Sequence, residues 1–66
     1  MMTKRSYYLD IQEQTPHGQR HVMEYSAGEM AEMFTEAQMA ALAAGDSVML
    51  GLSRCTDMQA FMDSRA

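Results

Sequence analysis

Two histidines separated by four positions are the first candidates for metal-binding or acid–base chemistry. His17 and His21 would share one face of a helix, but Pro16 and Gly18 favour a turn at this point of the chain. On an extended strand, positions four apart lie about 13 Å from each other, which is too far for two ligands of one metal ion. We therefore interpret both as solvated surface histidines and predict no metal site.

Cys55 is the next candidate, because a thiol can act as a nucleophile. It follows Arg54 and precedes a predicted helix start, an environment that lowers the pKa of a thiol. A catalytic thiol also needs a base, and both histidines belong to a distant part of the chain. A buried or half-buried thiol without chemistry is therefore the preferred interpretation. Since Cys55 is the single cysteine, no internal disulfide is expected.

The carboxylates and serines give no stronger indication of catalysis. Glu29, Glu32 and Glu36 are spaced along one helical face. Glycoside chemistry needs two carboxyl groups that flank a cleft for a sugar ring, and a chain of 66 residues leaves little room for one. The serines lack a nucleophile-elbow context, and the sequence contains no glycine-rich phosphate loop. We predict that the protein is not an enzyme and binds no cofactor.

Length and charge limit the remaining functions. Residues 1–66 are predicted to form a single domain with a small core. The net charge of -4 has the wrong sign for direct binding to nucleic acid. No apolar run reaches the roughly 18 residues of a membrane span, and the basic start of the chain is not followed by the apolar segment of a secretory signal. Together with the single cysteine, these features predict a cytoplasmic protein.

Alternation of apolar and polar residues predicts three strands. Residues 6–12 and 20–25 both alternate, and the turn residues between them predict a β-hairpin with a loop longer than two residues. A third, short strand is predicted at 47–52. The side chains expected to point into the core are Tyr7, Leu9 and Ile11, then Met23 and Tyr25, then Val48, Leu50 and Leu52.

Three helix starts match the capping box, in which a hydroxyl residue is followed three positions later by Glu or Gln. The hydroxyl residues are Ser26, Thr35 and Thr56. Each start precedes apolar residues at the spacing of one helical face, which predicts three amphipathic helices. The stripes expected to be buried are Met30, Met33 and Phe34, then Met39, Leu42 and Ala43, then Met58, Phe61 and Met62.

The expected fold class is therefore α+β, with the element order β-β-α-α-β-α. We expect a three-stranded, mainly antiparallel sheet with the helices on one face. The connection through two helices allows either strand order 1-2-3 or strand order 2-1-3. The other face of the sheet would stay open to water, and it would carry Tyr8, Asp10, Gln12, Val22, Glu24, Met49 and Gly51.

Methionine content and acidic charge both have a structural and a functional interpretation. Most of the nine methionines fall on predicted core stripes, where methionine fills irregular gaps, but Met49 is interpreted as a contact residue. The acidic surplus indicates either ordinary solubility or complementarity to a basic partner. Carboxylates beside exposed aromatic rings could occupy a nucleic-acid-binding groove by imitating phosphates beside stacked bases. The residues predicted to bind such a partner are Tyr8, Asp10, Glu24, Glu29, Glu32, Glu36 and Met49.

In size, charge and element order, the whole chain resembles the small, acidic, phage-encoded inhibitors of host defence, above all the anti-CRISPR proteins. The resemblance implies stoichiometric inhibition of a CRISPR–Cas effector, with the type I Cascade complex favoured, in the cytoplasm of a host cell. The expected function is that of a non-catalytic protein-binding inhibitor that covers a basic nucleic-acid-binding surface. The alternative is a small dimeric regulatory or antitoxin-like structural module. Either way, we expect a monomer or homodimer that binds neither nucleic acid nor membrane.

Overall fold

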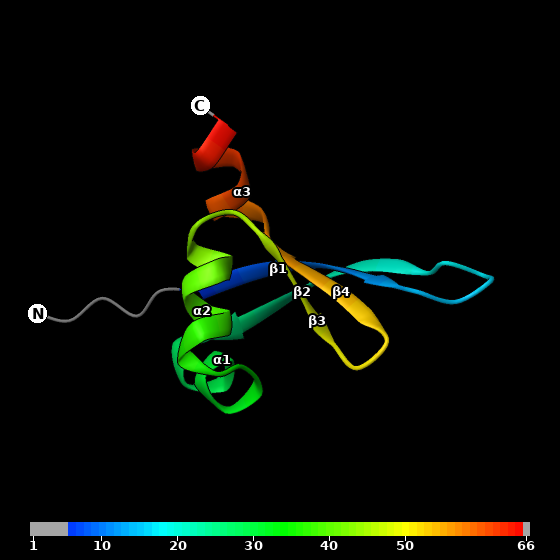
Figure 1. Cartoon of the computed structure of the whole chain (residues 1–66), viewed down its shortest axis with the longest axis horizontal. Coiled ribbons are helices and arrows are strands. Elements are labelled where there is room, and N and C mark those ends of the chain that lie inside the picture. The colour runs from blue at the N-terminus through cyan, green and yellow to red at the C-terminus, as the bar shows by residue number, and fades with distance from the viewer. Residues whose placement is uncertain (1–5, 66) are drawn as a thin grey trace, which may run out of the picture.

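The computed structural model describes residues 6–65. Within that range an antiparallel four-stranded sheet is combined with three helices, so the expected α+β class is confirmed (Figure 1). The strands lie in the order β2-β1-β4-β3. The elements are β1 (Ser6–Glu13), β2 (Arg20–Ser26), α1 (Ala27–Met33), α2 (Glu36–Ala43), β3 (Ser47–Leu50), β4 (Ser53–Asp57) and α3 (Met58–Arg65).

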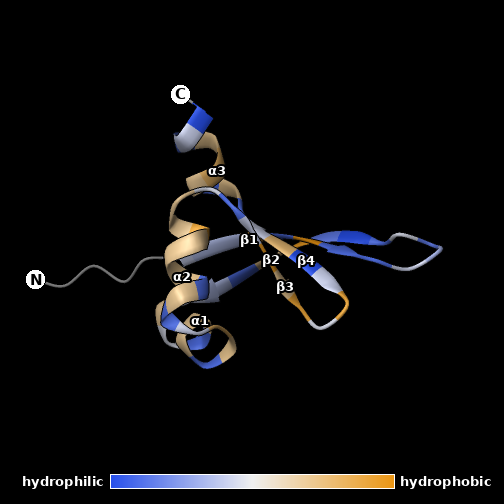
Figure 2. Ribbon diagram, in the orientation of Figure 1, coloured by the Kyte–Doolittle hydropathy of each residue, from blue (hydrophilic) through white to orange (hydrophobic). Residues whose placement is uncertain are grey.

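Strands β1 and β2 form the predicted hairpin. Their antiparallel register is unbroken and ends with Gln12 opposite Arg20. In the turn, Gly18 adopts a φ of 58°, and its N–H donates to the carbonyl oxygen of Thr15 at 3.0 Å. The hairpin extends as an arm beyond the helices and the other two strands (Figure 1), and its outer part is mostly hydrophilic (Figure 2).

Local capping determines where α1 and α2 begin. The hydroxyl of Ser26 accepts a hydrogen bond from the N–H of Glu29, whose carboxylate accepts one from the N–H of Ser26. Thr35 and Gln38 form the same reciprocal pair at the start of α2. Both capping boxes are thus confirmed. After α2, Gly45 takes a φ of 88°, the left-handed conformation that commonly follows a helix.

The C-terminal part of the sheet differs from the prediction. The strand expected at 47–52 ends at Leu50, and Gly51, with a φ of 64°, turns the chain back. Ser53–Asp57 then form β4, so the element order is β-β-α-α-β-β-α and not the expected β-β-α-α-β-α. The three predicted strands keep the relative order 2-1-3, with β4 inserted between β1 and β3, and the alternative order 1-2-3 is wrong. The sequence did not indicate β4 because Thr56 and Gln59 matched the capping box of a helix, and because Asp57 disfavours a strand. Antiparallel pairing with β1 on one side and β3 on the other stabilises it.

Helix α3 therefore begins one residue later than the predicted capping box would place it. Thr56, the expected cap, lies inside β4. The Oδ1 atom of Asp57 instead accepts from the N–H groups of Gln59 at 3.1 Å and Ala60 at 3.3 Å. This is the bonding pattern of a helix N-cap, and Asp57 is fully buried while it makes it.

One face of the sheet packs against α1 and α2. The buried cluster contains Leu9, Ile11, Val48 and Cys55 from the strands, and Met30, Phe34 and Leu42 from the helices. Tyr7 and Tyr25 pack against this cluster and are partly buried. The alternation of β1 and the stripe of α1 thus predicted the buried side correctly.

Other residues expected in the core are exposed. Met23 is 42% exposed, because it lies on β2 at the edge of the sheet. In α3 the buried residue is Ala60, which lies beside Gly45 after the end of α2, whereas the large side chains of the helix are exposed. The remaining exposed residues that had been expected in the core are Ala43, Leu50, Leu52, Met58, Phe61 and Met62.

Candidate protein-binding surfaces

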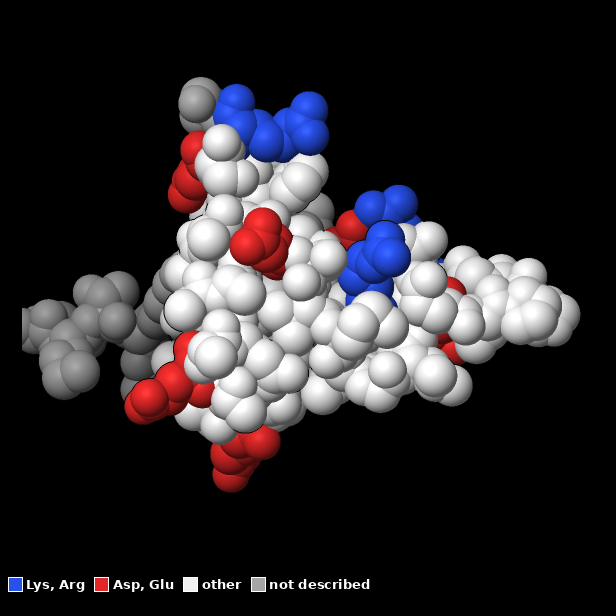
Figure 3. Space-filling model, viewed as in Figure 1, with Lys and Arg blue, Asp and Glu red and all other residues white. Residues whose placement is uncertain are grey.

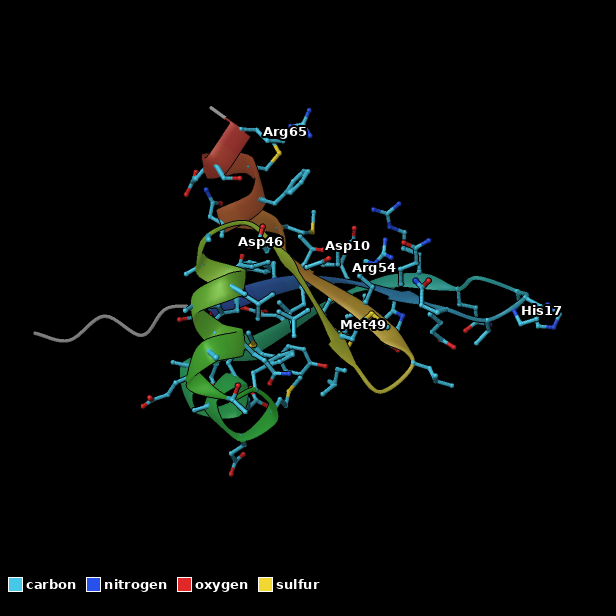
Figure 4. The ribbon with its side chains drawn as sticks, in the orientation of Figure 1. Asp10, His17, Asp46, Met49, Arg54 and Arg65 are labelled. Atoms are coloured by element: carbon cyan, nitrogen blue, oxygen red, sulfur yellow. The ribbon has the colours of Figure 1, made fainter. Side chains whose placement is uncertain are left out.

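The face of the sheet opposite α1 and α2 is exposed, as predicted. The register places on this open face Tyr8, Asp10 and Gln12 of β1, Arg20, Val22 and Glu24 of β2, Met49 of β3, and Arg54 and Thr56 of β4. Tyr8 and Met49 are about half exposed, at 47% and 46%. Asp10, Arg54 and Met49 lie along one stretch of the sheet (Figure 4). Gly51, which was expected on this face, lies in the turn between β3 and β4.

Asp10 and Arg20 form a two-point ion pair across β1 and β2. The Nε of Arg20 donates to Oδ1 of Asp10 at 2.9 Å, and the Nη2 group donates to Oδ2. The hydrogen bonds from Arg20 lower the pKa of Asp10 below its ordinary value, and those to Asp10 raise the pKa of Arg20. Asp10, one of the predicted partner-binding acids, is thus already paired within the chain.

We expect this ion pair to make a small contribution to stability that is lost in acid. The pKa of Asp10 is lower in the folded state, so the contribution is present above the ordinary pKa of 3.8 and disappears as the pH falls through the folded value. An exposed pair contributes little, so the effect is modest. In urea denaturation, Asp10→Asn should be less stable than the wild type at neutral pH, and the two should converge in acid. A difference that does not change with pH would contradict this.

Tyr8 and Glu24 form a second pair on the open face, directly opposite each other on β1 and β2. The negative charge of Glu24, followed by the hydrogen bond between the two side chains, raises the pKa of Tyr8. Two of the predicted partner-binding residues thus lie side by side on the exposed face of the sheet.

Two arginines balance the charge of the open face. Arg20 and Arg54 lie on it together with Asp10 and Glu24, so their formal charges cancel. The alternation of residues 20–25 could have placed Arg20 there, whereas the position of Arg54 depends on β4, which the sequence did not indicate. The open face is therefore not where the net negative charge of the protein resides.

Helix α3 borders the open face, so the three helices do not all cover one side of the sheet as expected. Met58 and Met62 line a shallow groove together with Tyr8 and Val22. Phe61 and Arg20 line an adjoining groove of about 260 Å³ with the same two methionines. Met62 is 64% exposed. The apolar stripe predicted for the core thus forms part of a surface, which the sequence pattern alone did not reveal.

Most of the net negative charge of residues 6–65 lies on the helical side of the molecule. Residues 27–46 contain four carboxylates and no lysine or arginine, and all four carboxylates are exposed. We call them the acidic layer: Glu29, Glu32, Glu36 and Asp46. Figure 3 shows acidic atoms and no basic atoms over α1 and α2, while the basic atoms lie over the sheet and the end of α3, where further acidic atoms are also seen.

The predicted partner-binding residues are thus divided between two surfaces. Glu29, Glu32 and Glu36 belong to the acidic layer, whereas Tyr8, Asp10, Glu24 and Met49 belong to the open face. Because α1 and α2 pack against the opposite side of the sheet, one flat partner surface cannot contact both sets at once. A partner would use one set, or would have to wrap around the domain.

The groups considered for catalysis do not converge. Cys55 is fully buried in the middle of β4, which agrees with the preferred interpretation of a buried thiol. Burial raises the pKa of this thiol, whereas Arg54 and the predicted helix start had indicated a lowered pKa. His17 lies at the tip of the hairpin arm (Figure 4), and His21 lies on β2. Within residues 6–65, no three His, Cys, Asp or Glu side chains are grouped so that they could hold a metal ion.

No helix in the described part of the chain is long and apolar enough to cross a membrane. Comparison with known proteins yields no match to this chain among protein-family models, curated proteins or solved structures.

Proposed function

We propose that this protein is a non-catalytic inhibitor of the anti-CRISPR type, which binds a basic nucleic-acid-binding surface of a host defence complex. The type I Cascade complex is the favoured target. The observation that carries the proposal is the acidic layer: a stretch of 20 residues with four exposed carboxylates and no basic side chain. A surface of one sign attracts a partner of the opposite sign and orients its approach.

Local structure accounts for only part of this charge. Glu29 takes part in the capping box of α1, and Glu36 lies in the first turn of α2, where the helix dipole favours an acid. Within residues 6–65, the side chains of Glu32 and Asp46 have no hydrogen bond or ion pair in the structure. Their charges are therefore available to a partner, and Glu32 is the better test because it lies within the helical layer.

The open face supports the same function as a second contact region. Tyr8 and Met49 provide apolar area on a rigid sheet, and α3 adds the exposed side chains of Met58 and Met62. Methionine adapts its shape to an irregular partner surface. Asp10 and Glu24 are balanced by arginines on this face, so we assign the electrostatic attraction to the acidic layer and only shape-dependent contact to the open face.

Inhibition of purified type I Cascade complexes tests the proposal. We expect the protein to abolish binding of target DNA at a stoichiometric ratio in a gel-shift assay, and to lose potency as salt is raised. Glu32→Lys should weaken inhibition about tenfold, or roughly 1.4 kcal/mol. The matched control is Asp63→Lys, which makes the same change of charge on α3 at a residue that is not part of the acidic layer, and it should leave potency nearly unchanged.

Two results would overturn the proposal. One is undisturbed DNA binding by every type I complex in the presence of excess protein. The other is equal loss of potency in Glu32→Lys and Asp63→Lys, because net charge alone, and not the acidic layer, would then determine inhibition.

A further inference from the structure

Strand β2 forms one edge of the sheet, and the direction of its backbone groups follows from two hydrogen bonds. The N–H of Glu13 donates to the carbonyl oxygen of Gln19 at 2.8 Å, so odd-numbered residues of β1 bond toward β2. The N–H of Gln14 donates to the carbonyl oxygen of Leu52 at 2.8 Å, on the other side of β1. This agrees with the first bond, because it shows that even-numbered residues of β1 bond toward β4. The even-numbered residues of β2 therefore direct their N–H and C=O groups away from the sheet: Arg20, Val22, Glu24 and Ser26.

This edge lacks several of the features that prevent strands from pairing with other chains, although it does carry the charged residues Arg20 and Glu24. Arg20–Ser26 contains no proline, no glycine and no bulge, and it pairs regularly with β1 along its length. Within residues 6–65, no further strand lies beyond it. The hairpin arm also extends past the helices, so they do not cover its outer part (Figure 1).

The side chains along this edge are complementary to themselves. On the open face, β2 carries the pattern Arg20, Val22, Glu24, with one residue between each. If a second copy of β2 lies antiparallel with the two Val22 residues opposite each other, Arg20 of each copy lies opposite Glu24 of the other. Opposite charges directly across an antiparallel pair stabilise it, and like charges destabilise it.

We propose that this protein forms a homodimer in which β2 pairs antiparallel with β2 of a second copy, with Val22 at the two-fold axis. Arg20, Val22 and Glu24 then form the hydrogen-bonded pairs, since their backbone groups already point outward. The two four-stranded sheets become one continuous sheet. A register shifted by two residues would place Val22 opposite Glu24 and would lose both charge pairs.

The ion pair within each chain supports this arrangement. Asp10 uses Nε and Nη2 of Arg20, and Arg20 remains 65% exposed, so the guanidinium keeps further N–H groups for Glu24 of the second copy. The dimer contact uses the open-face residues Arg20, Val22 and Glu24 of β2, but it includes neither Met49 of β3 nor any residue of the acidic layer. The proposed inhibition depends chiefly on the acidic layer, so either proposal can fail without the other.

A charge-swap experiment tests the dimer and its register. Sedimentation equilibrium of the wild type should show a reversible dimer. Arg20→Glu and Glu24→Arg each place like charges opposite each other twice, so each variant alone should dimerise at least about tenfold more weakly. An equimolar mixture of the two should form heterodimers, because every cross-strand pair is then of opposite sign. The double variant R20E/E24R should recover the wild-type dimer, because every pair across the two-fold axis is again of opposite sign. Positions 20 and 24 both lie diagonally opposite Asp10, so the arginine of the double variant still has this carboxylate as a neighbour within its own chain.

Val22→Pro provides a second test that does not involve charge. The N–H of Val22 points away from β1, so proline should abolish the dimer while the far-UV circular dichroism of the monomer is retained. A wild-type protein that stays monomeric at all concentrations would overturn the proposal. The exposed edge of β2 would then be free to pair only with a strand of a different protein. A dimer that is unaffected by Val22→Pro would also overturn the proposal, as would single variants that fail to form heterodimers when mixed.

Discussion

Leu9→Ala is expected to lower the free energy of unfolding by about 3 kcal/mol. Leu9 is fully buried in the middle of β1, where it packs between the sheet and helices α1 and α2. Truncation of a buried leucine removes apolar contact and leaves a cavity, at a cost of roughly 2–5 kcal/mol. Since a domain of this size is stabilised by only roughly 3–10 kcal/mol, the variant should lose a large part of its stability. Urea denaturation followed by far-UV circular dichroism measures the change.

Tyr8→Ala is the matched control for Leu9→Ala. Tyr8 is the neighbouring residue, but its side chain lies on the open face and is about half exposed. We expect its replacement to cost about 1 kcal/mol or less, because little apolar area returns to water. Equal losses for the two variants would mean that the sheet does not separate a buried face from an exposed one, and that the open face is wrongly assigned.

Asp57→Ala is expected to cost about 2 kcal/mol, the second largest effect. The side chain of Asp57 is fully buried and accepts hydrogen bonds from the N–H groups of Gln59 and Ala60. Alanine would leave both donors without this partner at the start of α3, and loss of an N-cap costs roughly 0.5–2 kcal/mol before the buried position is considered. Thermal unfolding should show a lower Tm and reduced helical signal.

Two variants distinguish a capping role of Asp57 from simple loss of side-chain volume. Asp57→Asn keeps an oxygen that can accept the same hydrogen bonds, so it should be more stable than Asp57→Ala. Thr56→Ala removes the residue that the capping-box pattern indicated, and it should cost only about 0.5 kcal/mol because Thr56 lies in β4 and does not cap α3. A larger loss for Thr56→Ala than for Asp57→Ala would reverse the assignment of the cap.

Features that depend on neighbouring residues were predictable. The hairpin follows from alternation in residues 6–12 and 20–25 and from the turn residues between them. The starts of α1 and α2 follow from Ser26 and Thr35, because a capping box is formed within four residues. The burial of Leu9 and Ile11 follows from the same alternation, since a strand covered on one side directs every second side chain to the core.

The candidate surfaces were only partly predictable. Tyr8, Glu24 and Met49 lie on the open face as alternation indicated. The presence of Arg54 beside them was not predictable, because it depends on β4. The position of the apolar stripe of α3 depends on the direction in which the helix leaves β4, and the stripe faces the groove beside the open face. Helical spacing shows that a stripe exists, but not what it faces.

By itself the sequence determined the hairpin, the two capped helices, the buried side of β1 and the concentration of acidic residues between 27 and 46. These features depend on backbone preferences and hydrogen bonds over a few residues. Only the tertiary structure decided that Ser53–Asp57 is a strand, that Asp57 and not Thr56 caps α3, and that the acidic residues are divided between two surfaces. The reason is physical: β4 has weak strand preference of its own, and it is stabilised by hydrogen bonds to β1, more than 40 residues earlier in the chain, and to β3.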